Sequence, residues 1–132
     1  MTCRLTIPGR LPGLNEYIAA ERSSRYQGNA MKQTEGRRVG LCIRQQLRGV
    51  RITRPVVMRY TWVEPDRRRD KDNISSFGRK VIQDALVRAG TLRGDGWAEI
   101  DGFSDVFQVD RDNPRIEVEI VEMEAACGKA KG

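Results

Sequence analysis

Alternating apolar and polar residues predict four strands along the chain. Residues 3–7 and 56–63 alternate with the period of a half-buried strand, and prolines and glycines or a charged segment follow each of them. Residues 103–110 and 116–122 alternate in the same way. Because residues 110–114 between them are turn formers, this last pair is expected to form an antiparallel hairpin.

Apolar residues at helical spacing predict two main helices. The first lies within residues 30–48, where an apolar stripe runs between arginines. The second carries a wider apolar stripe, with Asp72 or Asn73 as its N-cap and Gly90 as a left-handed C-terminal stop. A short helix is expected to start within residues 15–20.

The polar, basic stretch at residues 23–29 is expected to be a mobile loop. The elements predict an α+β fold, with a small mixed or mainly antiparallel sheet of about four strands packed with two main helices. One domain over residues 1–124 and a flexible tail over residues 125–132 are expected. Tyr60 and Trp62 occupy core strand positions. For Trp97, burial in the core is favoured over an exposed role in its glycine-rich loop.

Charge is distributed unevenly along the 132 residues, whose formal net charge is +6. Residues 1–93 carry 20 Lys and Arg against 8 Asp and Glu, whereas residues 94–132 carry 4 against 10. A basic region of this size favours binding to a polyanion, because each phosphate that it neutralises releases condensed counterions. Nucleic acid is the partner that this pattern favours over a merely soluble basic surface.

Composition narrows the chemistry. The chain has no histidine, so a catalytic metal would be held by oxygen ligands. Its three cysteines lie far apart without a C-x-x-C pair, which predicts reduced thiols. No apolar run approaches the about 20 residues that a membrane span needs. We therefore expect a cytoplasmic protein with no membrane partner and no organic cofactor.

Carboxylates and arginines are crowded into residues 65–84, directly after a predicted strand. Asp70 and Asp72 are two residues apart, so in an extended chain their side chains lie on one side and can share a divalent cation. Mg²⁺ suits one or two carboxylates with water and a phosphate. The alternative is a solvated loop of paired charges. A calcium-binding EF-hand is excluded, because Ser75 and Val81 stand where it needs Gly and Glu.

A further acidic group, which includes Asp95, follows the second helix. D-x-D-N at residues 70–73, then Lys80 with Asp84-Ala85-Leu86, then Ala89-Gly90 and the acidic loop form one combination. Together with Leu14-Asn15-Glu16-Tyr17 near the start, this combination resembles the RusA family of Holliday junction resolvases.

The resemblance implies a homodimeric endonuclease that depends on Mg²⁺, with Mn²⁺ as an alternative, and cuts branched DNA at four-way junctions. By motif, Asp70, Asp72 and Asp95 are the metal ligands and catalytic residues, and Lys80 is the catalytic cation. Two departures concern Gly94, where the family often has a second acidic residue, and Ser76, where its lysine tends to stand. Lys80 is preferred because it keeps its four-residue spacing to Asp84, and Arg79 is the substitute.

Basic residues supply candidate DNA contacts. The arginines at 67–69 either clamp phosphates or neutralise the neighbouring carboxylates. A non-catalytic, basic nucleic-acid-binding accessory protein is the main rival function, and a nuclease directed at RNA or flaps is another. The candidate DNA-binding residues are Arg67, Arg68, Arg69, Lys71, Asn73, Arg79, Arg37, Arg38 and Arg44, with Arg22, Arg25, Lys32 and Arg48 as further arm contacts.

Overall fold

The computed structural model describes residues 1–124, and the expected flexible tail at residues 125–132 lies outside them. Three helices and a four-stranded mixed sheet confirm the α+β class in its coarse form. The third helix, at Leu14–Ser23, lies where a short helix was expected in addition to the two main ones. In chain order the elements are β1 (Thr2–Pro8), α1 (Leu14–Ser23), α2 (Arg25–Gln46), β2 (Val56–Glu64), α3 (Lys71–Arg88), β3 (Ile100–Val109) and β4 (Arg115–Glu122).

The strand order is β1-β4-β2-β3, so the predicted β3–β4 hairpin is wrong. β4 lies between β1 and β2 and is antiparallel to both, whereas β3 is parallel to β2. α3 provides the crossover that a parallel pair requires. After β3 the chain passes over the end of β2, and the Asp110 N–H still bonds to the Glu64 carbonyl at 2.8 Å. The turn residues therefore link two strands that are not neighbours.

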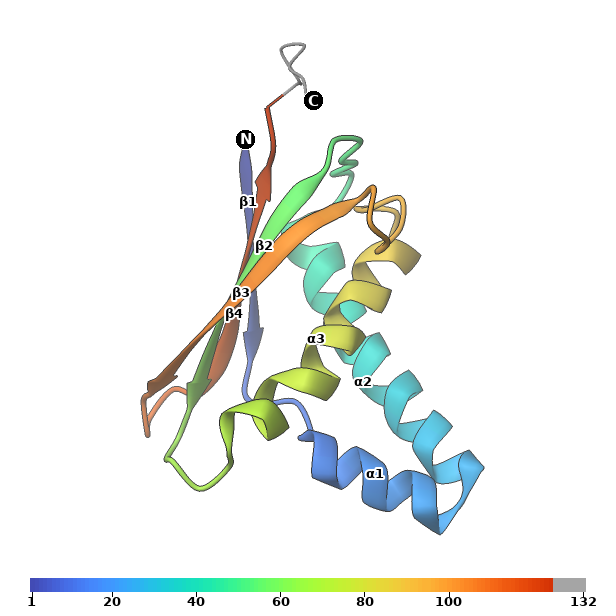
Figure 1. The fold of residues 1–132 in the computed structure, drawn as a ribbon, viewed down its shortest axis with the longest axis vertical. Helices are drawn as coiled ribbons and strands as arrows, with labels where there is room; N and C mark the ends of the chain where they lie inside the picture. The colour runs from blue at the N-terminus through green and yellow to red at the C-terminus, as the bar shows by residue number, and fades with distance from the viewer. Residues whose placement is uncertain (125–132) are drawn as a thin grey trace.

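All three helices cover one face of the sheet (Figure 1). The alternate residues of the strands that face them form the core, as the period of two predicts. Leu5 of β1, Val118 of β4 and Tyr60 of β2 are opposite one another in register, and each is 1% exposed. Trp62 is also 1% exposed, so the core positions of Tyr60 and Trp62 are confirmed.

Trp97 is fully exposed, which makes the expectation of a core position wrong. It lies between α3 and β3, in a turn whose neighbours Gly96 and Ala98 provide no bulky side chain against which the indole can pack. The strand alternation that buries Trp62 does not reach this turn. Trp97 is therefore a large aromatic surface open to solvent.

Two helix boundaries differ from the sequence-based expectations. Residues 23–29 are not a loop, because Ser24 caps α2 by accepting a hydrogen bond from the Gln27 N–H at 3.0 Å. α3 begins at Lys71 with Asp70 as its N-cap, earlier than the expected caps. Gly90 follows α3 with a φ of 81°, which confirms the left-handed stop.

α1 is attached to the start of α3. The Tyr17 ring stacks on Phe77 with centroids 4.6 Å apart, and the Asn15 N–H bonds to the Asn73 side chain at 2.7 Å. These two contacts fix the first turn of α1 beside the first turns of α3. No helix within residues 1–124 is both long and apolar enough to cross a membrane.

Replacing Gly78 by alanine is expected to destabilise the fold. A Cβ at this position would lie 2.9 Å from the Trp62 ring. Trp62 cannot retreat without losing the 2.8 Å bond from its indole N–H to Asp105. We expect Gly78→Ala to cost about 1–2 kcal/mol in urea unfolding, despite the better helix propensity of alanine.

Gly40→Ala is the matched control, because a Cβ at Gly40 meets nothing within 4 Å. Helix propensity should raise its stability by up to about 1 kcal/mol. Equal behaviour of the two variants would show that Trp62 does not limit this contact.

Candidate functional site

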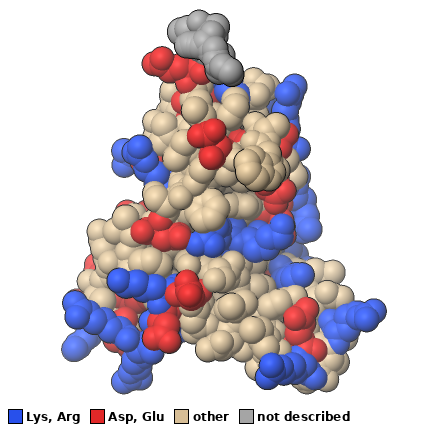
Figure 2. Space-filling view, in the orientation of Figure 1, with Lys and Arg blue, Asp and Glu red and all other residues tan. Residues whose placement is uncertain are grey.

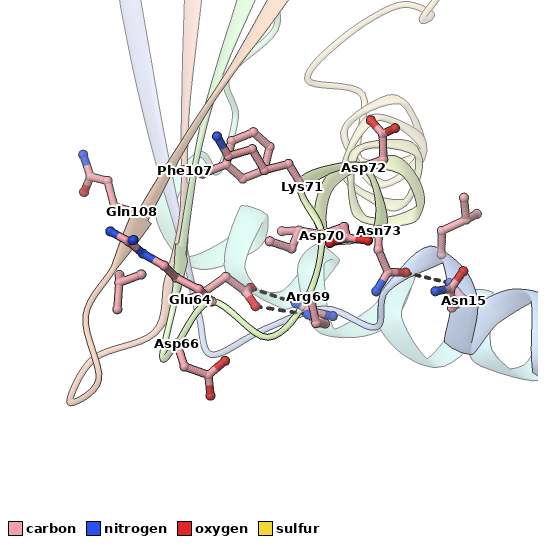
Figure 3. Close-up of a pocket in the computed structure, with 14 residues that line it drawn as sticks. Asn15, Glu64, Asp66, Arg69, Asp70, Lys71, Asp72, Asn73, Phe107 and Gln108 are labelled. Atoms are coloured by element: carbon pink, nitrogen blue, oxygen red, sulfur yellow. Dashed lines mark hydrogen bonds and ion pairs between the residues drawn. The ribbon is translucent and has the colours of Figure 1, made fainter.

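An open hollow lies where β2, α3, α1 and β3 approach one another (Figure 3). Its volume is about 1260 Å³, and it is lined by the loop that joins β2 to α3, by the first turn of α3 and by the end of β3. Carboxylates and cations both line it. The charged residues are Glu64, Asp66, Arg67, Arg69, Asp70, Lys71 and Asp72.

Asp70 and Asp72 both lie at the start of α3, and the helix dipole there favours negative charge. Asp70 is the N-cap, yet its side chain makes no capping hydrogen bond. Within residues 1–124, the ion pairs of the hollow involve Asp66 and Glu64, whereas Asp70 and Asp72 take part in none. Two exposed carboxylates thus remain without a cationic partner in the described part of the chain.

The two carboxylates do not share one side of the chain, contrary to the expectation from their spacing. α3 begins between them, and positions two apart on a helix do not face each other. In Figure 3 the Asp72 side chain points away from that of Asp70. Each carboxylate therefore offers its oxygens separately to the solvent around the start of α3.

Arg69 is committed to Glu64 at the end of β2. Its guanidinium donates to the two carboxylate oxygens at 3.1 and 2.8 Å, and to the Leu11 carbonyl at 3.2 Å. Arg10 also pairs with Glu64, at 3.4 Å. Sequence reasoning missed Glu64, although its place in the alternation of Tyr60 and Trp62 puts it on the buried side. Of the three predicted clamp residues, Arg69 is thus structural in this conformation.

The other two arginines of the run are exposed. Arg68 lies 3.6 Å from Asp66, a pair that solvent screens, and Arg67 lines the hollow. Lys71 extends over the Phe107 ring, with its Nζ 5.7 Å from the centroid. Of the predicted phosphate contacts, Arg67 and Lys71 are therefore exposed cations that line the hollow.

Lys80 and Asp95, two of the four predicted catalytic residues, lie together. The Lys80 ammonium is 3.4 Å from both Asp84 and Asp95. The negative charge of Asp84, and then that of Asp95, raises the pKa of Lys80, so its positive charge is maintained. Sequence spacing alone places Lys80 about 12 Å along α3 from Asp72.

The predicted metal ligands are thus in two places, with Asp95 beside Lys80 and Asp70 and Asp72 at the start of α3. Within residues 1–124, no three acidic or cysteine side chains are gathered closely enough to hold a metal ion together. Mg²⁺ keeps several waters and can be bound through one carboxylate together with a substrate phosphate, so Asp70 or Asp72 can serve without the other.

Arg79, the proposed substitute for Lys80, lies beneath β3. Its guanidinium pairs with Asp105 at 2.5 Å and lies 4.4 Å from the Phe103 ring centroid. Asp105 also accepts the Trp62 indole N–H, so one carboxylate joins α3, β2 and β3. Sequence reasoning missed Asp105, although it falls between Phe103 and Phe107 on the alternation that faces the helices. Arg79 has a structural role here, and its contact with DNA stays a prediction.

Two more predicted DNA contacts have structural partners. Arg38 donates to the carbonyls of Pro8 and Arg10 at 2.5 and 2.7 Å, which ties α2 to the segment after β1. Asn73 holds the start of α1. Arg37 and Arg44, in contrast, are exposed on α2. Figure 2 shows basic side chains along the lower edge of this face, with acidic side chains both among them and above.

Comparison with models of protein families and with curated proteins finds no match for this chain.

Asp105→Asn should destabilise the fold by about 2–3 kcal/mol, because it leaves the half-buried Arg79 without its anionic partner. Asparagine keeps an acceptor for the Trp62 indole, so the loss reports mainly on charge. Asp110→Asn, which breaks the more exposed pair with Arg115, should cost less than about 1 kcal/mol. Chemical denaturation measures both, and equal losses would contradict a special role for Asp105.

Proposed function

We propose that the chain is a structure-selective DNA endonuclease that resolves four-way junctions with Mg²⁺, or with Mn²⁺ in its place. The observation that carries the proposal is the hollow at the start of α3. There, Asp70 and Asp72 have no cationic partner within residues 1–124, while Arg67 and Lys71 line the same surface. Free carboxylates beside free cations suit a metal ion together with a phosphodiester.

Asp70 and Asp72 are the proposed metal-holding residues, and Asp95 is the third carboxylate of the set. When bound, the metal ion would supply an activated water and stabilise charge on the phosphodiester. Oxygen donors suit a hard cation of this kind, and the chain has no histidine to offer a softer site.

The cations have a separate task, which is to bind and orient the DNA backbone. Arg67 presents a planar fork of donors to a phosphate, and Lys71 presents a point charge held near the Phe107 ring. Lys80 keeps its positive charge through Asp84 and Asp95. It is the proposed catalytic cation because of its place in the motif, and it lies about 12 Å along α3 from Asp72.

Paired cleavage of a junction needs two such sites, so we include a two-fold homodimer in the proposal. β3 is an edge strand, and Phe103, Val106 and Val109 on it are each about half exposed, at 52, 50 and 51%. Open backbone groups and apolar side chains on one edge favour pairing with a second copy of the chain.

The separation of Asp95 from Asp70 favours a second candidate, the non-catalytic nucleic-acid-binding protein. In this alternative, Asp95 serves only to pair with Lys80, and the basic surface binds DNA without cutting it. Cleavage and binding must therefore be measured separately.

Asp72→Asn should lower the rate at which a labelled four-way junction is cleaved in Mg²⁺ by at least about 100-fold. Binding of the junction in EDTA should persist. Linear duplex and flap substrates test the selectivity. Asp66→Asn is the matched control, because Asp66 lines the same hollow but already pairs with Arg68. It should retain cleavage. Tight binding by wild type without cleavage in any divalent ion would refute the endonuclease and favour the binding protein.

Asp95→Asn and Asp84→Asn separate the two roles open to Asp95. Each removes one of the two anionic partners of Lys80, both at 3.4 Å. If Asp95 belongs to the catalytic set, Asp95→Asn should lower single-turnover cleavage at least about 100-fold, and Asp84→Asn less than about 10-fold. Equal rates in the two variants would remove Asp95 from the site.

A further inference from the structure

A second cavity, distinct from the hollow at the start of α3, opens between α2 and the end of α3. Its volume is about 570 Å³. No acidic residue lines it, although acidic residues are frequent elsewhere in the chain. We call it the arginine cleft, after the five arginines that line it: Arg37, Arg44, Arg48, Arg51 and Arg88.

The five guanidinium groups of the arginine cleft are exposed, and within residues 1–124 none forms an ion pair. Arg51 donates one hydrogen bond to the Val50 carbonyl, at 3.1 Å. Arg38, on the same helix but outside the cleft, is in contrast paired with Glu35 at 3.0 Å. Like charges brought together without a counterion repel one another, so the cleft is set up to receive negative charge.

On the α2 side of the arginine cleft, two glycines leave the helix backbone without side chains. Gly36 and Gly40 are one turn apart and both line it. A Cβ at Gly40 would meet no atom of the protein within 4 Å, so internal packing does not require glycine there. Glycine within a helix costs up to about 1 kcal/mol relative to alanine. An external group that approaches the α2 backbone closely gives this glycine a function.

The charge decides between possible occupants. A second copy of the chain docked on this surface would place another five arginines against the first five, so a self-complementary contact is disfavoured. A phosphodiester backbone supplies repeated negative charges to which guanidinium groups donate in pairs. Arg44 lies in the last turn of α2 and Arg48 in the turn that follows it, and both line the cleft, so the two can contact neighbouring charges on a strand.

We propose that the arginine cleft binds the phosphate backbone of a DNA arm, at a distance from the hollow where cleavage is proposed. This inference rests on the proposed function, because the same DNA occupies both places. α3 has 18 residues and joins the hollow at its start to the cleft at its end, a length of about 27 Å. At about 3.4 Å per base pair, the cleft contacts the arm about eight base pairs from the hollow.

The first test measures binding of a labelled four-way junction by fluorescence anisotropy in EDTA, so that cleavage plays no part. Arg44→Gln with Arg48→Gln should raise Kd about 10-fold or more and lower the slope of log Kd against log salt by about 1.8. The charge-matched control is Arg4→Gln with Arg59→Gln, because both arginines pair with Glu119 on β4. The control should change Kd less than about 3-fold. Equal losses in the two double variants would overturn the proposal.

Arm length provides a second test of position. On junctions whose arms are cut to about five base pairs, the Arg44 and Arg48 substitutions should lose most of their effect, because the arm no longer reaches the cleft. An effect that does not depend on arm length would contradict the proposed placement.

Gly40→Leu tests the close approach without changing charge. Leucine at Gly40 should leave thermal stability equal or higher while weakening junction binding at least about 5-fold, because the side chain fills the groove. Unchanged binding would exclude an approach of DNA to this part of α2.

Failure of the cleft and failure of the endonuclease give different results. Cleavage that requires Asp72 but binding that ignores Arg44 and Arg48 would leave the nuclease and overturn the cleft. Binding that requires Arg44 and Arg48 without cleavage by wild type would support the cleft and overturn the nuclease.

Discussion

The pairing of Glu64 with Arg69 is the interaction on which the proposed site depends. Glu64 ends β2 and is 5% exposed, and Arg69 binds both of its carboxylate oxygens across the loop that leads to α3. Removing Arg69 would leave the buried Glu64 carboxylate with only its longer pair to Arg10, at 3.4 Å, and breaking a buried ion pair typically costs about 3–5 kcal/mol. Arg10 and the Leu11 carbonyl join the same group, so it also ties down the segment before α1. This buried ion pair thus forms part of the wall of the hollow.

α3 connects the separate parts of the molecule. The helix forms the crossover from β2 to β3, and Gly78 on its buried face lies against the Trp62 ring. Its start presents Asp70 and Asp72, its middle presents Lys80, and its end borders the arginine cleft. A rigid helix fixes the distances among these groups more firmly than loops could. The spacing between the proposed contacts to the DNA would therefore be set by α3 alone.

Local patterns in the sequence predicted the elements well and their arrangement less well. Alternation identified all four strands, because burial of every second residue is a local property. Strand order depends on pairing between distant segments, so the expected hairpin after β3 was wrong. The direction of the Asp70 and Asp72 side chains depended on where α3 begins, and the expected caps, Asp72 or Asn73, lie two or three residues after the actual cap, Asp70. Glu64 and Asp105 were overlooked because an acidic residue on a buried face is recognised only when its arginine partner is known.

The position of β4 between β1 and β2 has a consequence for the order in which the protein folds during synthesis. β1 pairs with β4 and with no other strand of the described chain. Well over a hundred residues separate Thr2 from its partner Val121, so β1 must wait for nearly all of the described chain to leave the ribosome. Until then the apolar side chains of Leu5 and Ile7 lack their strand neighbours, and closing so long a loop slows folding. In a nascent chain, β1 therefore stays unpaired until late in synthesis, and its apolar residues are open to chaperones until then.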